Sequence, residues 1–203
     1  MRNPRWLILL FVVVYAFMLF GGAALKPGYS AMSQYISELG ATDSAHAVLI
    51  SMGGFIPVGA LAALLLGAMA AHVPVSGASR VGYWLLMCEP LAWIGSALAP
   101  CDLGCPLEGS LSQAVHNLLG VFTYLGTTLG LVLLAATPHI KLPTRLFWIA
   151  LATIWLLLFV LMGTPPLHDW RGLLQRLSEW LVYGALCVAA WRLASPAGAP
   201  RRE

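Results

Sequence analysis

The sequence has few charged side chains for its length. Of its 203 residues, only 9% are Asp, Glu, Lys or Arg, whereas 60% are hydrophobic. The mean hydropathy is +0.83. So few charges cannot coat a water-soluble globule, and the chain must be solvated largely by a lipid bilayer. The composition therefore predicts an integral membrane protein and excludes an ordinary soluble domain.

Basic residues are too scattered to form a nucleic-acid-binding surface. The net charge is +3, and the 11 lysines and arginines stand near the ends of apolar runs instead of clustering on one face. No nucleic-acid partner is expected. The alternating apolar pattern of a membrane barrel is also missing. We therefore expect helical spans, because a helix satisfies its backbone hydrogen bonds within one segment.

Six apolar runs are long enough to cross a bilayer core roughly 30 Å thick, which takes about 20 residues. The first is longer than the apolar core of a signal peptide and lacks a small-x-small cleavage site, so we expect it to remain as a span. The predicted fold class is all-α, a polytopic bundle forming a single six-helix transmembrane domain over residues 1–203. Its spans are predicted near residues 6–25, 47–71, 81–100, 113–135, 145–163 and 172–192.

The distribution of basic residues predicts which side of the membrane each loop occupies. Lysine and arginine favour the cytoplasmic side of short loops. With the N-terminus inside, Lys26 and Arg171 are the basic residues of the outer loops. The cytoplasmic side then holds Arg2, Arg5, Arg80, Lys141, Arg145, Arg192, Arg201 and Arg202. Both termini are therefore predicted to be cytoplasmic.

The first outer loop contains the longest polar run of the chain, YSAMSQYISELGATDSAH at residues 29–46. On a helix, Tyr29, Met32, Ile36 and Leu39 recur at steps of three and four, while polar residues occupy the other faces. This pattern predicts a short amphipathic helix in the first outer loop. It would lie in the membrane interface or fold over the bundle as a lid, and the sequence leaves open whether that lid is structural or contacts a substrate.

Polar residues inside spans are costly in lipid and mark a candidate site. At 1.5 Å per residue, Glu89, Arg176 and Glu179 share a depth of roughly 10 to 17 Å, so they can pair. One interpretation is an ion pair that pins helices together. The other is an outward-opening polar cavity, with Arg176 as an anion anchor and a glutamate as a proton carrier. The candidate polar site comprises Ser33, Glu38, Glu89, His116, Asn117, Gln175, Arg176 and Glu179.

The second outer loop contains Cys101 and Cys105. An oxidising compartment favours a disulfide between them, although so short a loop is geometrically demanding. The rival interpretation is a metal site built from both thiolates and His116. Cys88 and Cys187 lie within predicted spans and are interpreted as packing residues.

Two further metal hypotheses come from the histidines. A zinc ion could activate water for hydrolysis with Glu38 as the base, on the ligands His46, Asp102, His116 and His168. A di-haem arrangement would use the histidines that bracket the second and fourth spans, namely His46, His72, His116 and His139. Neither set has the close helical spacing of a metal pair, so no cofactor is predicted, and zinc and haem remain alternatives.

Three motifs, YSAMSQYISELGA, HN at residues 116–117 and GLLQR in the last span, resemble the bacterial and archaeal membrane family known as domain of unknown function 998. The resemblance covers essentially the whole chain. It implies a six-helix protein of the plasma membrane without an established activity. The ISELG element is also similar to eukaryotic Frag/DRAM-like membrane proteins, some of which are implied in lipid remodelling. The matching positions are Ser33, Ser37, Glu38, Gly40, His116, Asn117, Gln175 and Arg176.

These features favour a protein that binds or processes a membrane lipid or amphiphile at the outer leaflet. A proton-coupled carrier of small solutes using Glu89 and Glu179 is the first alternative. A metal-dependent membrane hydrolase and a structural or assembly partner are the others. Whether the protein is an enzyme, and in what oligomeric state it exists, is left open by the sequence.

Overall fold

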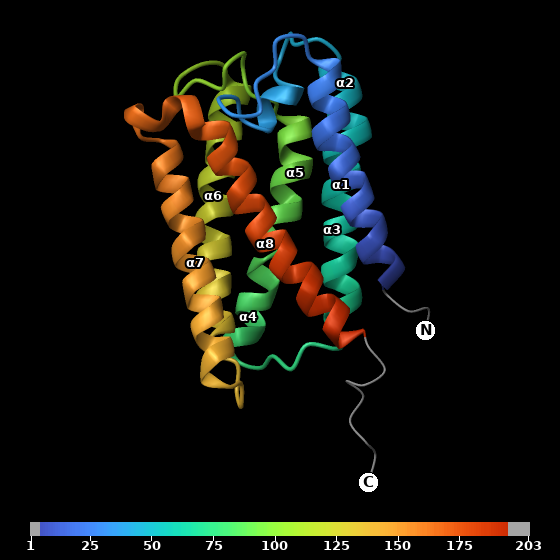
Figure 1. Cartoon of the computed structure of the whole chain (residues 1–203), viewed down its shortest axis with the longest axis vertical. Coiled ribbons are helices and arrows are strands. Elements are labelled where there is room, and N and C mark those ends of the chain that lie inside the picture. The colour runs from blue at the N-terminus through green and yellow to red at the C-terminus, as the bar shows by residue number, and fades with distance from the viewer. Residues whose placement is uncertain (1–4, 195–203) are drawn as a thin grey trace.

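The computed structural model describes residues 5–194, and within them it contains helices and connections but no strand (Figure 1). Three short elements interrupt or connect the α-helices: 3-10 helices at Ser37–Gly40 and Pro165–Trp170, and a π-helix at Ser51–Phe55. The α-helices are α1 (Arg5–Leu25), α2 (Ala47–Ile50), α3 (Ile56–Met69), α4 (Ala78–Leu85), α5 (Cys88–Leu98), α6 (Leu111–Leu134), α7 (Leu142–Met162) and α8 (Arg171–Leu193).

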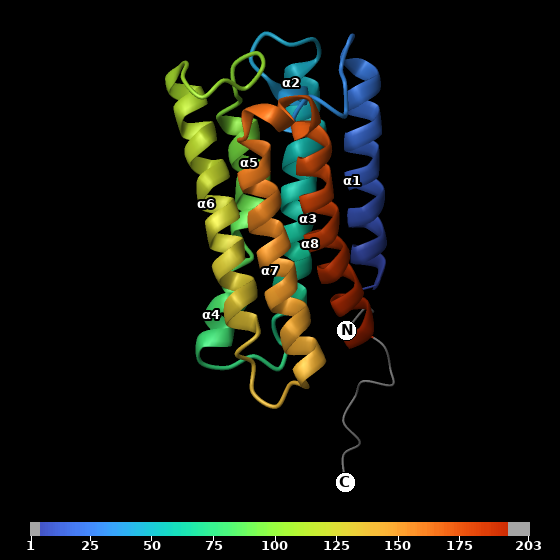
Figure 2. The same ribbon diagram turned by 60° about the vertical axis from the view of Figure 1, so that its left-hand side comes forward.

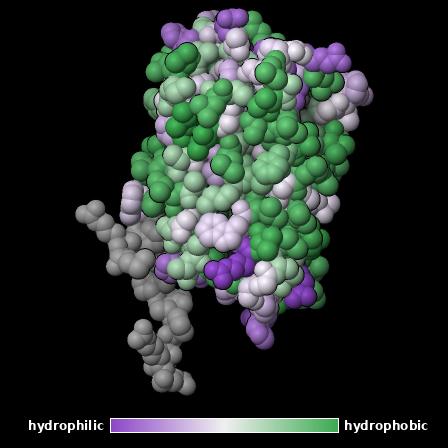
Figure 3. Space-filling view, turned by 180° about the vertical axis from the view of Figure 1, so that it is seen from behind, coloured by the Kyte–Doolittle hydropathy of each residue, from purple (hydrophilic) through white to green (hydrophobic). Residues whose placement is uncertain are grey.

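Five helical stretches are long and apolar enough to cross a membrane, and they match the first five predicted spans. The chain is thus a multi-pass membrane protein. α8 has 23 residues and runs beside the other helices in Figure 2, but it is less apolar, so the sixth span stays a prediction. Figure 3 shows a hydrophobic surface around the middle of the molecule. The five stretches are Arg5–Leu25, Ala47–Met69, Ala78–Leu98, Leu111–Leu134 and Leu142–Met162.

Two of the spans are not continuous α-helices. The second passes through the π-helix just before Pro57, and the third breaks between α4 and α5 just before Pro90. Proline has no N–H to donate and its ring crowds the preceding turn, so the helix widens or breaks there. The second break places Glu89 in the first turn of α5, where it is only 1% exposed.

Glycines allow the helices around α5 to approach closely. A Cβ at Gly59 in α3 would lie 2.7 Å from the carbonyl oxygen of Pro90, and a Cβ at Gly82 in α4 would lie 2.7 Å from that of Gly130 in α6. Small residues at such crossings let the backbones of transmembrane helices pack against one another. The Gly59 contact holds α3 against the first turn of α5, which contains Glu89.

Three connections lie at the same end of the bundle: residues 26–46, 99–110 and 163–170 (Figures 1 and 2). Residues 5 and 194 lie at the opposite end. This clustering agrees with the three outer loops expected from the basic residues, while the sidedness itself stays a prediction. We call residues 26–46 the lid, because they fold over this end of the bundle.

The lid does not contain the amphipathic helix expected over residues 29–39. It consists of turns followed by the 3-10 helix at Ser37–Gly40. Ile36 and Leu39 are buried as the apolar stripe predicted, but Glu38 between them is also only 1% exposed. The periodicity was misleading because the lid backbone forms isolated turns, and several of its carbonyl oxygens and the N–H of Ile36 bond to α8, which a local helical pattern does not register.

Candidate functional site

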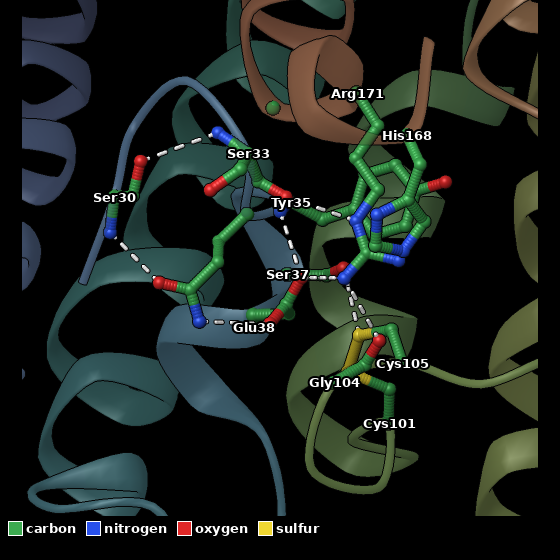
Figure 4. Close-up of polar contacts among 12 residues, drawn as sticks. Ser30, Ser33, Tyr35, Ser37, Glu38, Cys101, Gly104, Cys105, His168 and Arg171 are labelled. Carbon is green, nitrogen blue, oxygen red and sulfur yellow. Dashed lines mark hydrogen bonds and ion pairs between the residues drawn. A yellow bond between two sulfur atoms is a disulfide. The ribbon is translucent and has the colours of Figure 1, made fainter. Parts of the chain in front are cut away.

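Arg171, at the start of α8, fastens the lid to two other parts of the structure. Its Nε donates to the carbonyl oxygen of Ser33 at 3.0 Å, and its Nη2 donates to Oε1 of Glu38 at 2.9 Å (Figure 4). The same nitrogen donates to the carbonyl oxygen of Gly104 at 3.1 Å, and the guanidinium lies 4.6 Å from the ring centre of Tyr35. The planar fork of arginine suits such multiple contacts.

The Glu38 carboxylate is fully engaged by the lid. In addition to Arg171, it accepts the backbone N–H of Tyr35 at 3.0 Å and the side-chain amide of Gln34 at 3.1 Å. Lys26 donates to the Glu38 carbonyl oxygen. Burial lowers the pKa of Lys26, and the Glu38 charge opposes that shift. Lys26 and Arg171, the two basic residues that depart from the positive-inside pattern, thus both bind Glu38.

Arg176 does not act as the expected anion anchor and does not pair with Glu89 or Glu179. Its Nη1 donates to three carbonyl oxygens, those of Ala31 at 2.9 Å, Gln34 at 3.1 Å and Gly172 at 2.8 Å. Its Nη2 donates to the hydroxyl of Tyr29. The reason is that carbonyl oxygens of the lid lie against α8. They accept hydrogen bonds from the guanidinium of Arg176, which the sequence predicted to bind an anion.

Tyr29 completes this arrangement as a neutral phenol. Burial raises its pKa above the ordinary value, and the nearby Arg176 only partly offsets that shift. The protonated hydroxyl therefore accepts from Arg176 and donates to the carbonyl oxygen of Tyr35 at 2.8 Å. We call the contacts of Arg171 and Arg176 with the lid the clasp.

The backbone of the lid also contacts α8 directly. The N–H of Ile36 donates to Oε1 of Gln175 at 2.6 Å, and the N–H of Leu173 donates to the carbonyl oxygen of Met32 at 3.0 Å. A Cβ at Gly172 would collide with the carbonyl oxygen of Gln34. Glycine at this position is therefore what allows the lid to lie against the start of α8.

The second outer loop is stapled by a disulfide between Cys101 and Cys105, with the Cα atoms 5.1 Å apart, as predicted. The half-buried Asp102 accepts the backbone N–H and the hydroxyl of Ser110, which lower the pKa of its carboxyl. Asn117 donates to the carbonyl oxygen of Leu107 at 2.9 Å. Asp102 and Asn117 thus order this loop. Cys88 is buried and Cys187 half-buried, in agreement with packing roles.

The structure brings one predicted metal set together, the two cysteines and His116, but the two sulfurs are bonded to each other. In the described part of the chain, the group with ligand atoms within 4.8 Å of one another is Cys101, Cys105 and His116. His46 and His168 are outside it, and the disulfide engages both sulfurs. The Nδ1 atom of His116 lies 3.0 Å from the carbonyl oxygen of Ala99. The four ligands of the hydrolase set are therefore not gathered in one cluster within residues 5–194.

A polar cavity of about 70 Å³ lies beneath the lid. Four residues of the candidate polar site line it: Glu89, His116, Gln175 and Glu179. Residues 36–37 of the lid form part of its wall. The other predicted residues are elsewhere, because Glu38 and Arg176 belong to the clasp, Ser33 contributes a carbonyl oxygen to it, and Asn117 orders the second outer loop.

Glu89 and Glu179 have no cationic partner in the structure. Ion pairs within residues 5–194 join Arg171 to Glu38 and His168 to Asp169. Glu89 Oε1 accepts the Thr127 hydroxyl at 3.2 Å, and the two cavity carboxyls interact with each other.

Three buried polar atoms beside these carboxyls lack a hydrogen-bond partner among the described residues. They are Oε2 of Glu179 and the hydroxyls of Tyr15 and Tyr183. The two tyrosine rings are 5.7 Å apart and both interact electrostatically with Glu89 and Glu179. Buried polar groups are nearly always bonded in native proteins, so orphaned atoms next to a cavity indicate a place for a bound molecule or water.

A second cavity, also of about 70 Å³, is almost entirely apolar. Its lining includes Leu65, Met69 and Leu134, and it also includes Glu89. Glu89 is therefore shared by the polar and the apolar cavity. The apolar cavity could not be inferred from the sequence, because its walls are ordinary aliphatic residues from separate spans.

The candidate site predicted from the sequence contained neither Arg171 nor the aromatic side chains of the polar cavity. Arg171 had a signal, because it is one of two basic residues placed on the outer side. Phe55, Trp93 and Tyr124 line the polar cavity, but aromatic residues are common in any apolar span and carry no such signal.

The arrangement agrees with the resemblance seen in the motifs. No curated protein and no solved structure matches the chain. A family model described as protein of unknown function, DUF998, matches residues 8–192, which include the lid, the clasp, the polar cavity and every residue of the apolar cavity except Leu193. The chain belongs to this DUF998 family.

Proposed function

We propose that the protein binds or processes a lipid or another amphiphile from the outer leaflet. The observation that carries this proposal is the shared position of Glu89 between a polar and an apolar cavity. An amphiphile has the same division, with a polar headgroup joined to a hydrocarbon chain. The headgroup would occupy the polar cavity and the chain would enter the apolar one.

The lid supports the proposal by closing the polar cavity on its outer side. Ile36 and Ser37 line the cavity, while the clasp engages the charged groups of the lid. Because Nε and Nη2 of Arg171 and both Nη atoms of Arg176 already donate hydrogen bonds, the lid acts mainly as a cover. The ligand would instead meet the groups below it, including Gln175 and His116.

The first test is native mass spectrometry with elemental analysis on protein purified in a nonionic detergent. We expect a retained lipid and no stoichiometric zinc or iron. Glu179→Gln should reduce the retained lipid, whereas Glu108→Gln, at an exposed loop position, should not. Loss of lipid equally in both variants, or no lipid in either variant or in the unaltered protein, would argue against the proposal. Stoichiometric zinc that disappears in His116→Ala would favour the hydrolase.

A proton-coupled carrier is the second candidate. It is favoured by the two neighbouring carboxyls without a cationic partner and by the breaks in the helices before Pro57 and Pro90. Discontinuous spans near such groups are typical of secondary transporters. Solute uptake into vesicles that depends on a proton gradient and is lost in Glu89→Gln would support the carrier. Uptake that does not depend on the proton gradient would refute the carrier.

A further inference from the structure

The charge of the polar cavity limits the headgroup that it can hold. The cavity is lined by Glu89 and Glu179, and neither carboxyl has an arginine or lysine partner within residues 5–194. Arg176, the nearest candidate for an anion site, directs its donors to backbone oxygens and to Tyr29. An anionic headgroup would thus meet two acids and no available cation.

The aromatic side chains of the cavity add a second, independent constraint. Phe55, Trp93 and Tyr124 line it together with the two glutamates, and the Phe55 and Trp93 rings are 5.4 Å apart in an edge-to-face arrangement. The face of an aromatic ring attracts a cation within about 6 Å, and aromatic groups with a nearby carboxylate are a recurring way to hold an organic ammonium ion.

The same lining disfavours a hard metal ion. Calcium takes about six to eight oxygen ligands, and magnesium demands a nearly ideal octahedron. Phe55 and Trp93 in the lining supply no oxygen ligand, and the side-chain oxygen of Gln175 and the hydroxyl of Thr123 already bond to the protein. An organic ammonium group needs only carboxylates for its charge and ring faces for its carbon substituents.

An unbonded oxygen in the cavity wall is the third observation. Oε2 of Glu179, which lines the cavity, is a buried acceptor without a donor among the described residues. An ammonium ion donates and accepts nothing, so an amine headgroup can donate to this oxygen, and a quaternary ammonium interacts with it through charge alone.

We propose that the polar cavity is an ammonium site, so that the amphiphile bound by this protein carries an amine or quaternary ammonium headgroup. The carboxyls of Glu89 and Glu179 balance its charge, and Phe55, Trp93 and Tyr124 surround its carbon substituents. This assignment rests on the proposed function, because it names the headgroup of the same ligand. The sequence, with Arg176 as an anion anchor, suggested an anionic headgroup, and this proposal replaces it with a cationic one.

The test compares three probes with one hydrocarbon chain and different headgroups: decyltrimethylammonium, decyl phosphate and decyl maltoside. Binding to the full-length protein in a nonionic detergent is measured by native mass spectrometry as a function of probe concentration. We expect the ammonium probe to bind about tenfold more tightly than the other two, the difference that one favourable charge contact supplies. Glu179→Gln should remove most of this preference, and Glu108→Gln should retain it.

The outcomes separate the two proposals. Equal binding of all three probes, or tighter binding of the phosphate, would overturn the ammonium site and leave amphiphile binding in place. Failure of every probe to bind would overturn both. Because the headgroup comparison uses the unaltered protein, it stays decisive even where Glu179→Gln does not fold. A preference that persists unchanged in folded Glu179→Gln and folded Glu89→Gln would place the ammonium group elsewhere and refute the assignment.

Discussion

The clasp and the polar cavity are both rich in charged groups and lie next to each other, yet they satisfy those groups in opposite ways. In the clasp, the Glu38 carboxylate has an arginine, an amide and a backbone donor. In the cavity, Glu179 retains a buried oxygen without a partner. Saturated polar groups hold a structure together, whereas unsatisfied ones next to a void are available to a ligand.

The sequence predicted one polar site where the structure has two separate features, the clasp and the polar cavity. Glu38, Arg176 and Glu179 were predicted to form a single polar site, but the lid separates them into a fastening and a cavity.

The largest effect is expected from breaking the ion pair of the clasp. Arg171→Met leaves Glu38 charged, buried and without its cation, and removing one partner of a buried pair costs about 3 to 5 kcal/mol. The thermal unfolding midpoint in detergent should fall sharply. Arg145→Met, at an exposed position near the opposite end, is the control. Equal midpoints for the two variants would show that the clasp contributes little to stability.

A smaller loss is expected from adding a methyl group under the lid. Gly172→Ala forces the new Cβ against the Gln34 carbonyl, and overpacking of this kind costs about 1 to 3 kcal/mol. Gly184→Ala in the same helix meets no atom within 4 Å and should be neutral or slightly stabilising. The difference between the thermal unfolding midpoints of the two variants reports how closely the lid approaches α8. Equal midpoints would refute the contact.

Opening the disulfide should cost less than about 2 kcal/mol. The cysteines are separated by 4 residues, and closing so short a loop removes little entropy from the unfolded chain. A membrane-impermeant maleimide applied to intact cells should label Cys101 or Cys105 only after reduction. The labelling is done in the double variant Cys88→Ser, Cys187→Ser, so that no other thiol can react with the maleimide. Labelling without reduction would contradict the bridge, and labelling only in opened cells would reverse the predicted sidedness.

The smallest effect on stability is expected inside the cavity. Glu179→Gln and Glu89→Gln break no ion pair within residues 5–194 and replace each carboxyl with a neutral amide of the same shape, so the free energy of unfolding should change by less than about 1 kcal/mol. Glu38→Gln removes a charge that Arg171 needs and should lose about 2 kcal/mol. Chemical denaturation of the three variants compares them directly. A loss at Glu179 as large as at Glu38 would show that the cavity glutamate is structural.

Much of the fold could be predicted, because lipid imposes simple rules on a chain. The apolar runs gave five spans that the structure bears out, and prolines at positions 57 and 90 marked where helices are interrupted. The lid helix was wrong, since its apolar stripe reflected burial of Ile36 and Leu39 and not a helical backbone. The cavity residues on α5, α6 and α8 were selected by their polarity, which is conspicuous inside an apolar span.

The amino-acid sequence by itself determined that the chain is a membrane protein, where its first five spans run and which polar residues stand inside them. Those properties depend on the composition of single segments and on the thickness of the bilayer. Only the tertiary structure decided the partners of these residues. Whether Arg176 meets a carboxylate or a carbonyl depends on how residues 26–46 fold back onto α8, and that is set by contacts between segments more than 100 residues apart in the chain.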